Sequence, residues 1–161
     1  VLRPAVTSAL AELTAMRARE GAALAADLGA RRTHLLELGA HLRSRAAVLP
    51  ERFAQRLEER LGGPGRHLGI DPARLAQEVA LMAERLDVSE ELVRLDTHLG
   101  HLGEILGAGG AVGRKLDFVI QEIGRELNTV ASKAQDAEMA AVVIDAKAEL
   151  EKLREQAQNV E

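Results

Sequence analysis

The stretch that decides the fold is VGRKLDFVIQEIGRELNTVASKA, residues 112–134. Its apolar residues recur every three or four positions, which is the period of one face of an α-helix and not that of a strand. The spacing therefore predicts a helix over about residues 114–134. Its apolar stripe consists of Leu116, Val119, Ile120, Ile123, Leu127, Val130 and Ala134.

The same periodicity extends through the rest of the chain. Leucines at mostly three- and four-residue spacings predict a helix over about 4–48, which we expect to end before Pro50 because proline disfavours the helical conformation in the residue before it. Loops rich in glycine follow at 62–71 and 107–113. No segment alternates for long enough to predict a strand, so the expected fold is all-α, with long antiparallel helices in a bundle or in extended helical hairpins that oligomerise. The remaining helices are expected over about 50–61, 72–106 and 138–160.

Composition narrows the possible functions. A chain of 161 residues is long enough for one domain with a real core, and its net charge is −4. It has no cysteine, which excludes disulfides, thiolate zinc sites and cysteine nucleophiles. It also has no tryptophan or tyrosine and only two phenylalanines, which argues against an aromatic platform for stacking single-stranded nucleic acid. No run approaches the roughly 18 apolar residues that a membrane span requires, so we expect no membrane partner.

One face of the predicted helix over 72–106 carries residues of the types that bind metal ions. Asp87, Glu91, Arg94, His98 and His101 follow at steps of four, three, four and three, with Glu90 beside them. Carboxylates and imidazoles on one face are ligands for Mn²⁺ or Mg²⁺. The alternative is an ordinary ion pair between Glu90 and Arg94, with His98 on the helix surface.

The predicted helix over 114–134 has a polar face opposite its apolar stripe. Amides, hydroxyls and guanidiniums in such an array suit hydrogen bonding to a partner or to a phosphate backbone. Glu122 and Glu126 stand four residues apart and could share a metal ion. The alternative is a buried polar interface between helices. The face consists of Arg114, Asp117, Gln121, Arg125, Asn128 and Ser132, flanked by Glu122, Glu126, Thr129 and Lys133.

A basic ridge is expected on the predicted helix over 50–61. Arg52, Arg56 and Arg60 repeat every four residues and could track phosphates. Glutamates at 51, 58 and 59 dilute this charge, so the alternative is a solvated helix face.

Three blocks of sequence are RLDVSEELVRLDTHL (85–99), VGRKLDFVIQEIGRELNTVASKA (112–134) and EKLREQAQNVE (151–161). In this order they resemble the C-terminal half of the YicC/YloC family. The match is closest over 73–161, and the preceding residues, including REGAALAADL at 19–28, resemble the middle region of the family. The resemblance predicts a helical middle region over 1–71 and a C-terminal YicC-like helical domain over 72–161.

The resemblance implies a function and a setting. Members of the family are bacterial metal-dependent endoribonucleases that prefer manganese, act on RNA as ring-shaped homohexamers and take part in small-RNA turnover and stress. We therefore expect a cytoplasmic protein with Mn²⁺ or Mg²⁺ as cofactor and with RNA and further copies of itself as partners. The strand-rich N-terminal domain of the family is absent from this sequence, so an inactive fragment, or a non-catalytic helical scaffold for oligomerisation or RNA binding, is the alternative.

The resemblance also suggests roles for the polar residues of the two predicted helices. His101 lies outside the family motif, and Gly124 stands where family members usually have asparagine. The catalytic candidates are His98, Glu122, Glu126 and Arg125. The candidates for binding RNA phosphates are Arg94, Arg114, Lys133, Gln121 and Asn128. The candidate metal ligands are Glu90, Glu91, Glu122 and Glu126.

Overall fold

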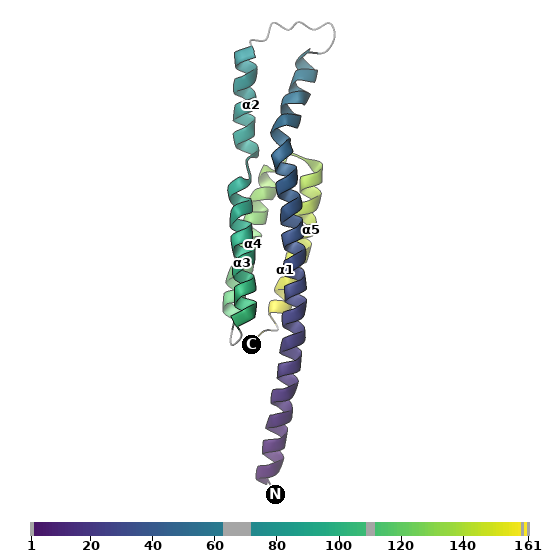
Figure 1. The fold of residues 1–161 in the computed structure, drawn as a ribbon, viewed down its shortest axis with the longest axis vertical. Helices are drawn as coiled ribbons and strands as arrows, with labels where there is room; N and C mark the ends of the chain where they lie inside the picture. Colours follow the sequence, from purple (N-terminus) through teal and green to yellow (C-terminus); the bar gives the residue numbers. More distant parts are fainter. Residues whose placement is uncertain (1, 63–71, 109–111, 159, 161) are drawn as a thin grey trace.

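A computed structural model of the chain describes residues 2–62, 72–108, 112–158 and 160. These residues form helices and their connections, with no strand among them, which confirms the all-α prediction. The helices are long and run alongside one another (Figure 1). They are α1 (Leu2–Gly62), α2 (Pro72–Leu86), α3 (Ser89–Ala108), α4 (Gly113–Lys133) and α5 (Ala137–Ala157).

Helix α1 is continuous through Pro50, so the prediction of separate helices over 4–48 and 50–61 was wrong. Proline removes one helical hydrogen bond and crowds the preceding turn, which is why a break was expected. Packing on both sides of the proline favours a single helix instead. Leu42 and Leu49 are buried in the core before Pro50, and the part of α1 beyond it lies beside α2 (Figure 1).

The predicted helix over 72–106 was also wrong, because the chain breaks between α2 and α3. The carboxylate of Asp87 accepts a hydrogen bond of 2.8 Å from the backbone N–H of Ser89, which satisfies a free donor at the start of α3. Hydrogen bonds from the side chain and from the backbone N–H of Ser89 lower the pKa of Asp87 below its usual value. Val88, between them, is only 1% exposed and turns into the core.

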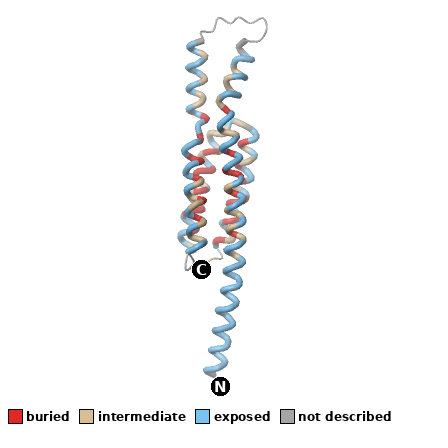
Figure 2. The backbone as a smooth tube through the Cα atoms, in the orientation of Figure 1, coloured by how far each residue is buried: buried red, intermediate tan, exposed pale blue. Residues whose placement is uncertain are grey.

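The core lies between α1, α3, α4 and α5 (Figure 2). Packing pairs α3 with α4, α1 with α5, α1 with α3, and α4 with α5, which is the arrangement of a four-helix bundle. On α1 four of the five buried leucines fall at seven-residue intervals, and on α4 the stripe predicted from sequence is buried from Leu116 to Val130. The intervals on α1 run through Leu28, Leu35, Leu42 and Leu49.

The N-terminal part of α1 extends beyond the bundle (Figures 1 and 2). Every residue from 3 to 23 is exposed, including the large apolar side chains of Val6, Leu10, Leu13 and Met16. Their spacings of four, three and three place them along one side of the helix. None of the described helices has the length and apolar character needed to cross a lipid bilayer.

An ion pair fixes the start of α5 against α1. The Arg45 guanidinium donates to both carboxylate oxygens of Asp136, over 2.9 and 2.8 Å. Asp136 also accepts from the Met139 backbone N–H at 3.0 Å, so the same carboxylate caps the helix. The hydrogen bonds from Arg45 lower the pKa of Asp136 to about 2, against the opposing effect of burial.

Gly124, in the middle of α4, is expected to tolerate a methyl group. A Cβ atom there would lie 3.4 Å from Cδ2 of Leu150 on α5, a contact that a flexible side chain can relax. Because glycine is a poor helix former, Gly124→Ala should raise the free energy of unfolding by about 0.5–1 kcal/mol, measured by urea denaturation.

The contrasting variant is Gly113→Ala. A Cβ atom at Gly113 would lie 2.9 Å from the backbone oxygen of Val160, which has less freedom to move, so this variant should gain nothing or lose stability. A Gly124→Ala protein less stable than the wild type would mean that the contact between α4 and Leu150 is too rigid to relax.

A candidate site between two antiparallel helices

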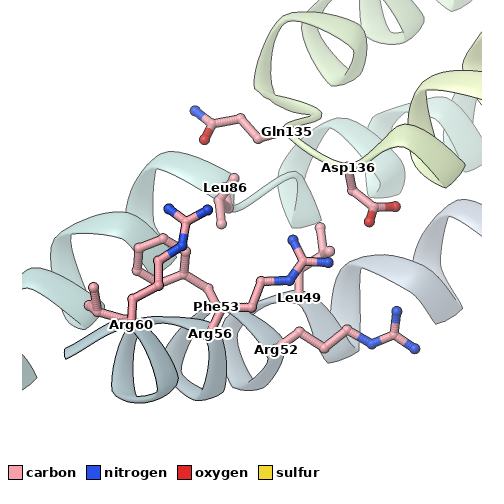
Figure 3. Close-up of a pocket in the computed structure, with 9 residues that line it drawn as sticks. Leu49, Arg52, Phe53, Arg56, Arg60, Leu86, Gln135 and Asp136 are labelled. Carbon is pink, nitrogen blue, oxygen red and sulfur yellow. The ribbon is translucent and has the colours of Figure 1, made fainter. Parts of the chain in front are cut away.

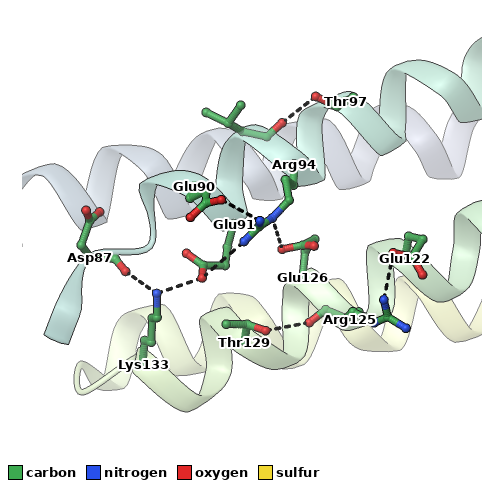
Figure 4. Close-up of polar contacts among 11 residues, drawn as sticks. Asp87, Glu90, Glu91, Arg94, Thr97, Glu122, Arg125, Glu126, Thr129 and Lys133 are labelled. Carbon is green, nitrogen blue, oxygen red and sulfur yellow. Dashed lines mark hydrogen bonds and ion pairs between the residues drawn. The ribbon is translucent and has the colours of Figure 1, made fainter. Parts of the chain in front are cut away.

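The packing of α3 against α4 brings together residues that are about thirty to forty positions apart in the sequence. The first turns of α3 supply Glu90, Glu91 and Arg94, and the C-terminal half of α4 supplies Glu126 and Lys133 (Figure 4). We call these five residues the ion-pair network. Each was predicted as a site residue, and the structure places all five within one set of contacts.

Arg94 is the centre of the ion-pair network. Its guanidinium lies 2.7 Å from a carboxylate oxygen of Glu90 on the same helix and 3.2 Å from one of Glu126 on α4. A third carboxylate, that of Glu91, lies 3.8 Å away. Burial opposes the charged form of Arg94, but the attraction of these three carboxylates prevails and raises the pKa of Arg94 above its usual value.

Lys133 neutralises the most buried carboxylate of the network. Its ammonium group donates to Glu91 over 2.8 Å and to the backbone oxygen of Asp87 over a further 2.8 Å. Glu91 is only 5% exposed, and burial favours its neutral form. The hydrogen bond and charge of Lys133, with the charge of Arg94, overcome that effect and hold the pKa of Glu91 below its usual value.

The outward face of α4 differs from the ion-pair network because most of its side chains face solvent. Glu122 is largely covered, with a side chain 18% exposed, and it pairs with the Arg125 guanidinium at 3.3 Å. The Arg125 side chain is 72% exposed. Within a single chain the predicted alternative of a buried polar helix interface therefore does not hold for these outward side chains, whereas Glu126 and Lys133 on the flank do form polar contacts with α3. Its other exposed candidates are Arg114, Gln121 and Asn128.

The catalytic candidate His98 stands apart from these groups. Its ring is half-buried on α3, with the ring of His101 edge-on at a centroid distance of 6.5 Å. In the described part of the chain, no hydrogen bond or ion pair joins His98 to the ion-pair network or to Glu122. The structure thus brings five of the predicted residues together and leaves His98 separate.

The carboxylates predicted as metal ligands are already used by cations of the protein. Glu90 and Glu126 bond to Arg94, Glu91 bonds to Lys133, and Glu122 bonds to Arg125. Among the described residues no three His, Asp or Glu side chains are grouped so as to hold a metal ion. One oxygen of Glu91 is buried without a hydrogen-bond partner there, but Mg²⁺ and its relatives require about six oxygen ligands. In this arrangement, the carboxylates of one chain do not fit a divalent metal site.

Two polar contacts of this region were missed by sequence reasoning. The bond from Lys133 to the backbone oxygen of Asp87 depends on where α2 ends, which periodicity placed wrongly. The pair of Arg45 and Asp136 joins residues 91 positions apart. Its only local signal is an aspartate just before a predicted helix, at a typical capping position.

The geometry defines a class of protein: a four-helix bundle with a partly buried ion-pair network between two of its helices and an exposed, basic and amide-rich helix face beside it. A family model described as "Endoribonuclease YicC-like, C-terminal" matches residues 42–161. The chain belongs to this family.

Two relatives that carry the same descriptive name extend the comparison. A protein of Clostridioides difficile (strain 630), named "Probable endoribonuclease YicC", is 40% identical over 165 residues, which cover 100% of this chain and 55% of that protein. A protein of Haemophilus influenzae with the same name is 43% identical over 156 residues, which cover 94% of this chain and 52% of that protein. The chain thus spans about half the length of the curated relatives it matches.

Proposed function

We propose that this chain is the helical part of a bacterial endoribonuclease that cleaves RNA phosphodiester bonds. The observation that carries the proposal is the identity of 40% and 43% to two bacterial proteins named as probable endoribonucleases, over nearly the whole chain. The predicted site residues lie in or beside one pair of packed helices, which supports a site on α3 and α4.

In this proposal the exposed face of α4 holds RNA. Arg114 and Arg125 neutralise phosphates, and the amides of Gln121 and Asn128 orient the backbone through hydrogen bonds. Glu122, partly covered and next to Arg125, removes a proton from the attacking oxygen as that oxygen bonds to phosphorus. The bond from phosphorus to the leaving ribose oxygen breaks, water protonates that oxygen, and Arg125 offsets charge on the phosphate. The ion-pair network holds α3 and α4 in register behind this face.

Dependence on Mn²⁺ or Mg²⁺ stays a prediction of the family resemblance. Within one chain the carboxylates expected to bind the metal are paired with arginine or lysine. Homo-oligomerisation, a cytoplasmic location and a role in small-RNA turnover under stress also belong to the proposal. The exposed apolar side chains along the N-terminal part of α1 support self-association.

The competing function is a helical scaffold without catalytic activity. One property of the ion-pair network favours it. Charged groups that neutralise one another between two helices hold those helices together and do not require a substrate. In that case the activity of the longer protein belongs to residues outside this chain, and these helices assemble or support it.

The deciding experiment compares the full-length natural protein with the 161-residue chain on a labelled structured RNA, with Mn²⁺, Mg²⁺ or EDTA. Cleavage by both proteins supports a site on these helices, whereas cleavage by the full-length protein alone supports the scaffold. Loss of cleavage in EDTA, restored by Mn²⁺, supports metal dependence. An intact RNA with the full-length protein under every condition would contradict the endoribonuclease proposal.

A further inference from the structure

A second basic feature lies on α1, outside the candidate site. Arg52, Arg56 and Arg60 repeat every four residues in the part of α1 beyond Pro50, and they line a pocket of about 240 Å³ (Figure 3). We call it the arginine pocket. Its walls come from three places in the chain: α1 itself, Leu86 at the end of α2, and the turn between α4 and α5 at Gln135 and Asp136.

The positive charge of the arginine pocket is not balanced within the described residues. None of its three arginines forms an ion pair there, although glutamates are present at 51, 58 and 59. The one carboxylate in the wall is that of Asp136, and both of its oxygens accept hydrogen bonds from Arg45. Three arginines therefore line one pocket without a counter-charge, which an anionic ligand would supply.

The spacing of the arginines favours a polymer over a single small anion. Residues four apart on a helix are separated by about 6 Å along its axis, so the three span about 12 Å. That length exceeds one phosphate group and matches successive phosphates of a nucleic-acid strand. Guanidiniums bind phosphate oxygens in pairs of parallel hydrogen bonds, and the half-buried ring of Phe53 adds an apolar surface for a sugar or base.

Residues of the arginine pocket are also close neighbours, in the sequence, of residues that contact the ion-pair network. Leu86 lines the pocket, and the backbone oxygen of the next residue, Asp87, accepts the hydrogen bond from Lys133. Gln135, on the opposite wall, follows Lys133 by two residues. A strand bound along the arginines would therefore reach the end of α4 that carries the network.

From this geometry we infer that the arginine pocket binds the phosphodiester backbone of RNA and forms a grip separate from the cleavage site. The inference rests on the proposed function for the identity of the ligand. It predicts that the pocket sets the affinity for RNA and leaves the chemical step to α3 and α4.

The test uses the full-length protein and fluorescence anisotropy with a labelled single-stranded RNA. The variant Arg52→Gln/Arg56→Gln/Arg60→Gln should weaken binding about 100-fold and reduce the slope of log affinity against log salt by about 2, because three phosphate contacts are lost. Glutamine is a good helix former, so circular dichroism should be unchanged. The matched control, Arg3→Gln/Arg19→Gln/Arg154→Gln, removes the same charge elsewhere and should change affinity less than about threefold.

The outcomes separate this inference from the proposed function. A higher KM with an unchanged kcat in the pocket variant supports a grip apart from the chemistry. In another outcome the wild type binds RNA tightly and the pocket variant weakly, with no cleavage by either protein. That result would support RNA binding by the arginine pocket and would overturn the endoribonuclease proposal. Equal loss of affinity in the pocket and control variants overturns the grip, as does displacement of RNA by inorganic phosphate at constant ionic strength, which would indicate a site for a single anion.

Discussion

The substitution Glu122→Gln is expected to lower the rate of RNA cleavage by the full-length protein about 100-fold or more, which is the usual contribution of a general base. Glutamine keeps the size of the side chain and an oxygen that can accept from Arg125, so the contact at 3.3 Å is preserved. It removes the ability to take a proton. The rate at saturating RNA should therefore fall, and circular dichroism and RNA affinity should not change.

A matched pair on α5 provides the control for that experiment. Glu151 and Arg154 have the same i,i+3 spacing as Glu122 and Arg125, with a separation of 3.9 Å, and the Glu151 side chain is 63% exposed. Glu151→Gln removes the same charge away from the candidate site and should leave cleavage unchanged. Equal rates for the two variants would show that Glu122 takes no part in the reaction.

Local patterns in the sequence predicted the helices well but two of their ends poorly. The stripe from Leu116 to Val130 fixes both the existence of α4 and its buried face, because periodicity reports burial directly. Pro50 indicated a break, yet contacts on both sides of it keep α1 continuous. At Asp87 the opposite occurred: an apolar stripe ran on, while a capping carboxylate started a new helix.

The polar faces that carry the candidate residues were predictable from spacing, but the pairing of those residues was not. Spacing placed Glu90 and Arg94 on one face of α3, and the i,i+4 pair suggested as the alternative does form. Which carboxylate on α4 meets Arg94, and which residue of α3 meets Lys133, depends on the register of two packed helices. No local pattern encodes that register, so the use of these carboxylates as partners of arginine and lysine emerged only from the fold.

The substitution Lys133→Met is expected to destabilise the protein by about 2–3 kcal/mol at pH 7, because breaking a buried ion pair leaves a charge without its partner. Glu91, with a side chain only 6% exposed, would keep just the Arg94 contact at 3.8 Å. The free energy of unfolding from urea denaturation measures the effect. Lys152→Met, which removes an exposed lysine that pairs with Glu149 at 3.2 Å, is the control and should cost less than about 0.5 kcal/mol.

The pH dependence of this loss distinguishes a broken ion pair from a simple loss of packing. In the wild type the pKa of Glu91 is lowered, so its ionised form adds stability that is present above the ordinary value of 4.5 and is lost as the pH falls below it. Without Lys133, burial should instead raise that pKa, and protonation of Glu91 would then relieve the variant. The stability difference between wild type and variant should therefore be largest at neutral pH and should shrink toward pH 4.

A double variant isolates the contribution of the ion pair between Glu91 and Lys133. Adding Glu91→Gln to Lys133→Met removes the unpaired charge and should restore part of the lost stability, because a buried neutral amide costs less than a buried carboxylate. Coupling between the two substitutions in this cycle measures the pair itself. Two results together would show that Lys133 stabilises the bundle by packing and not by its charge. The stability losses of the two single variants would add up in the double variant, and the loss caused by Lys133→Met would be the same at pH 7 and pH 4.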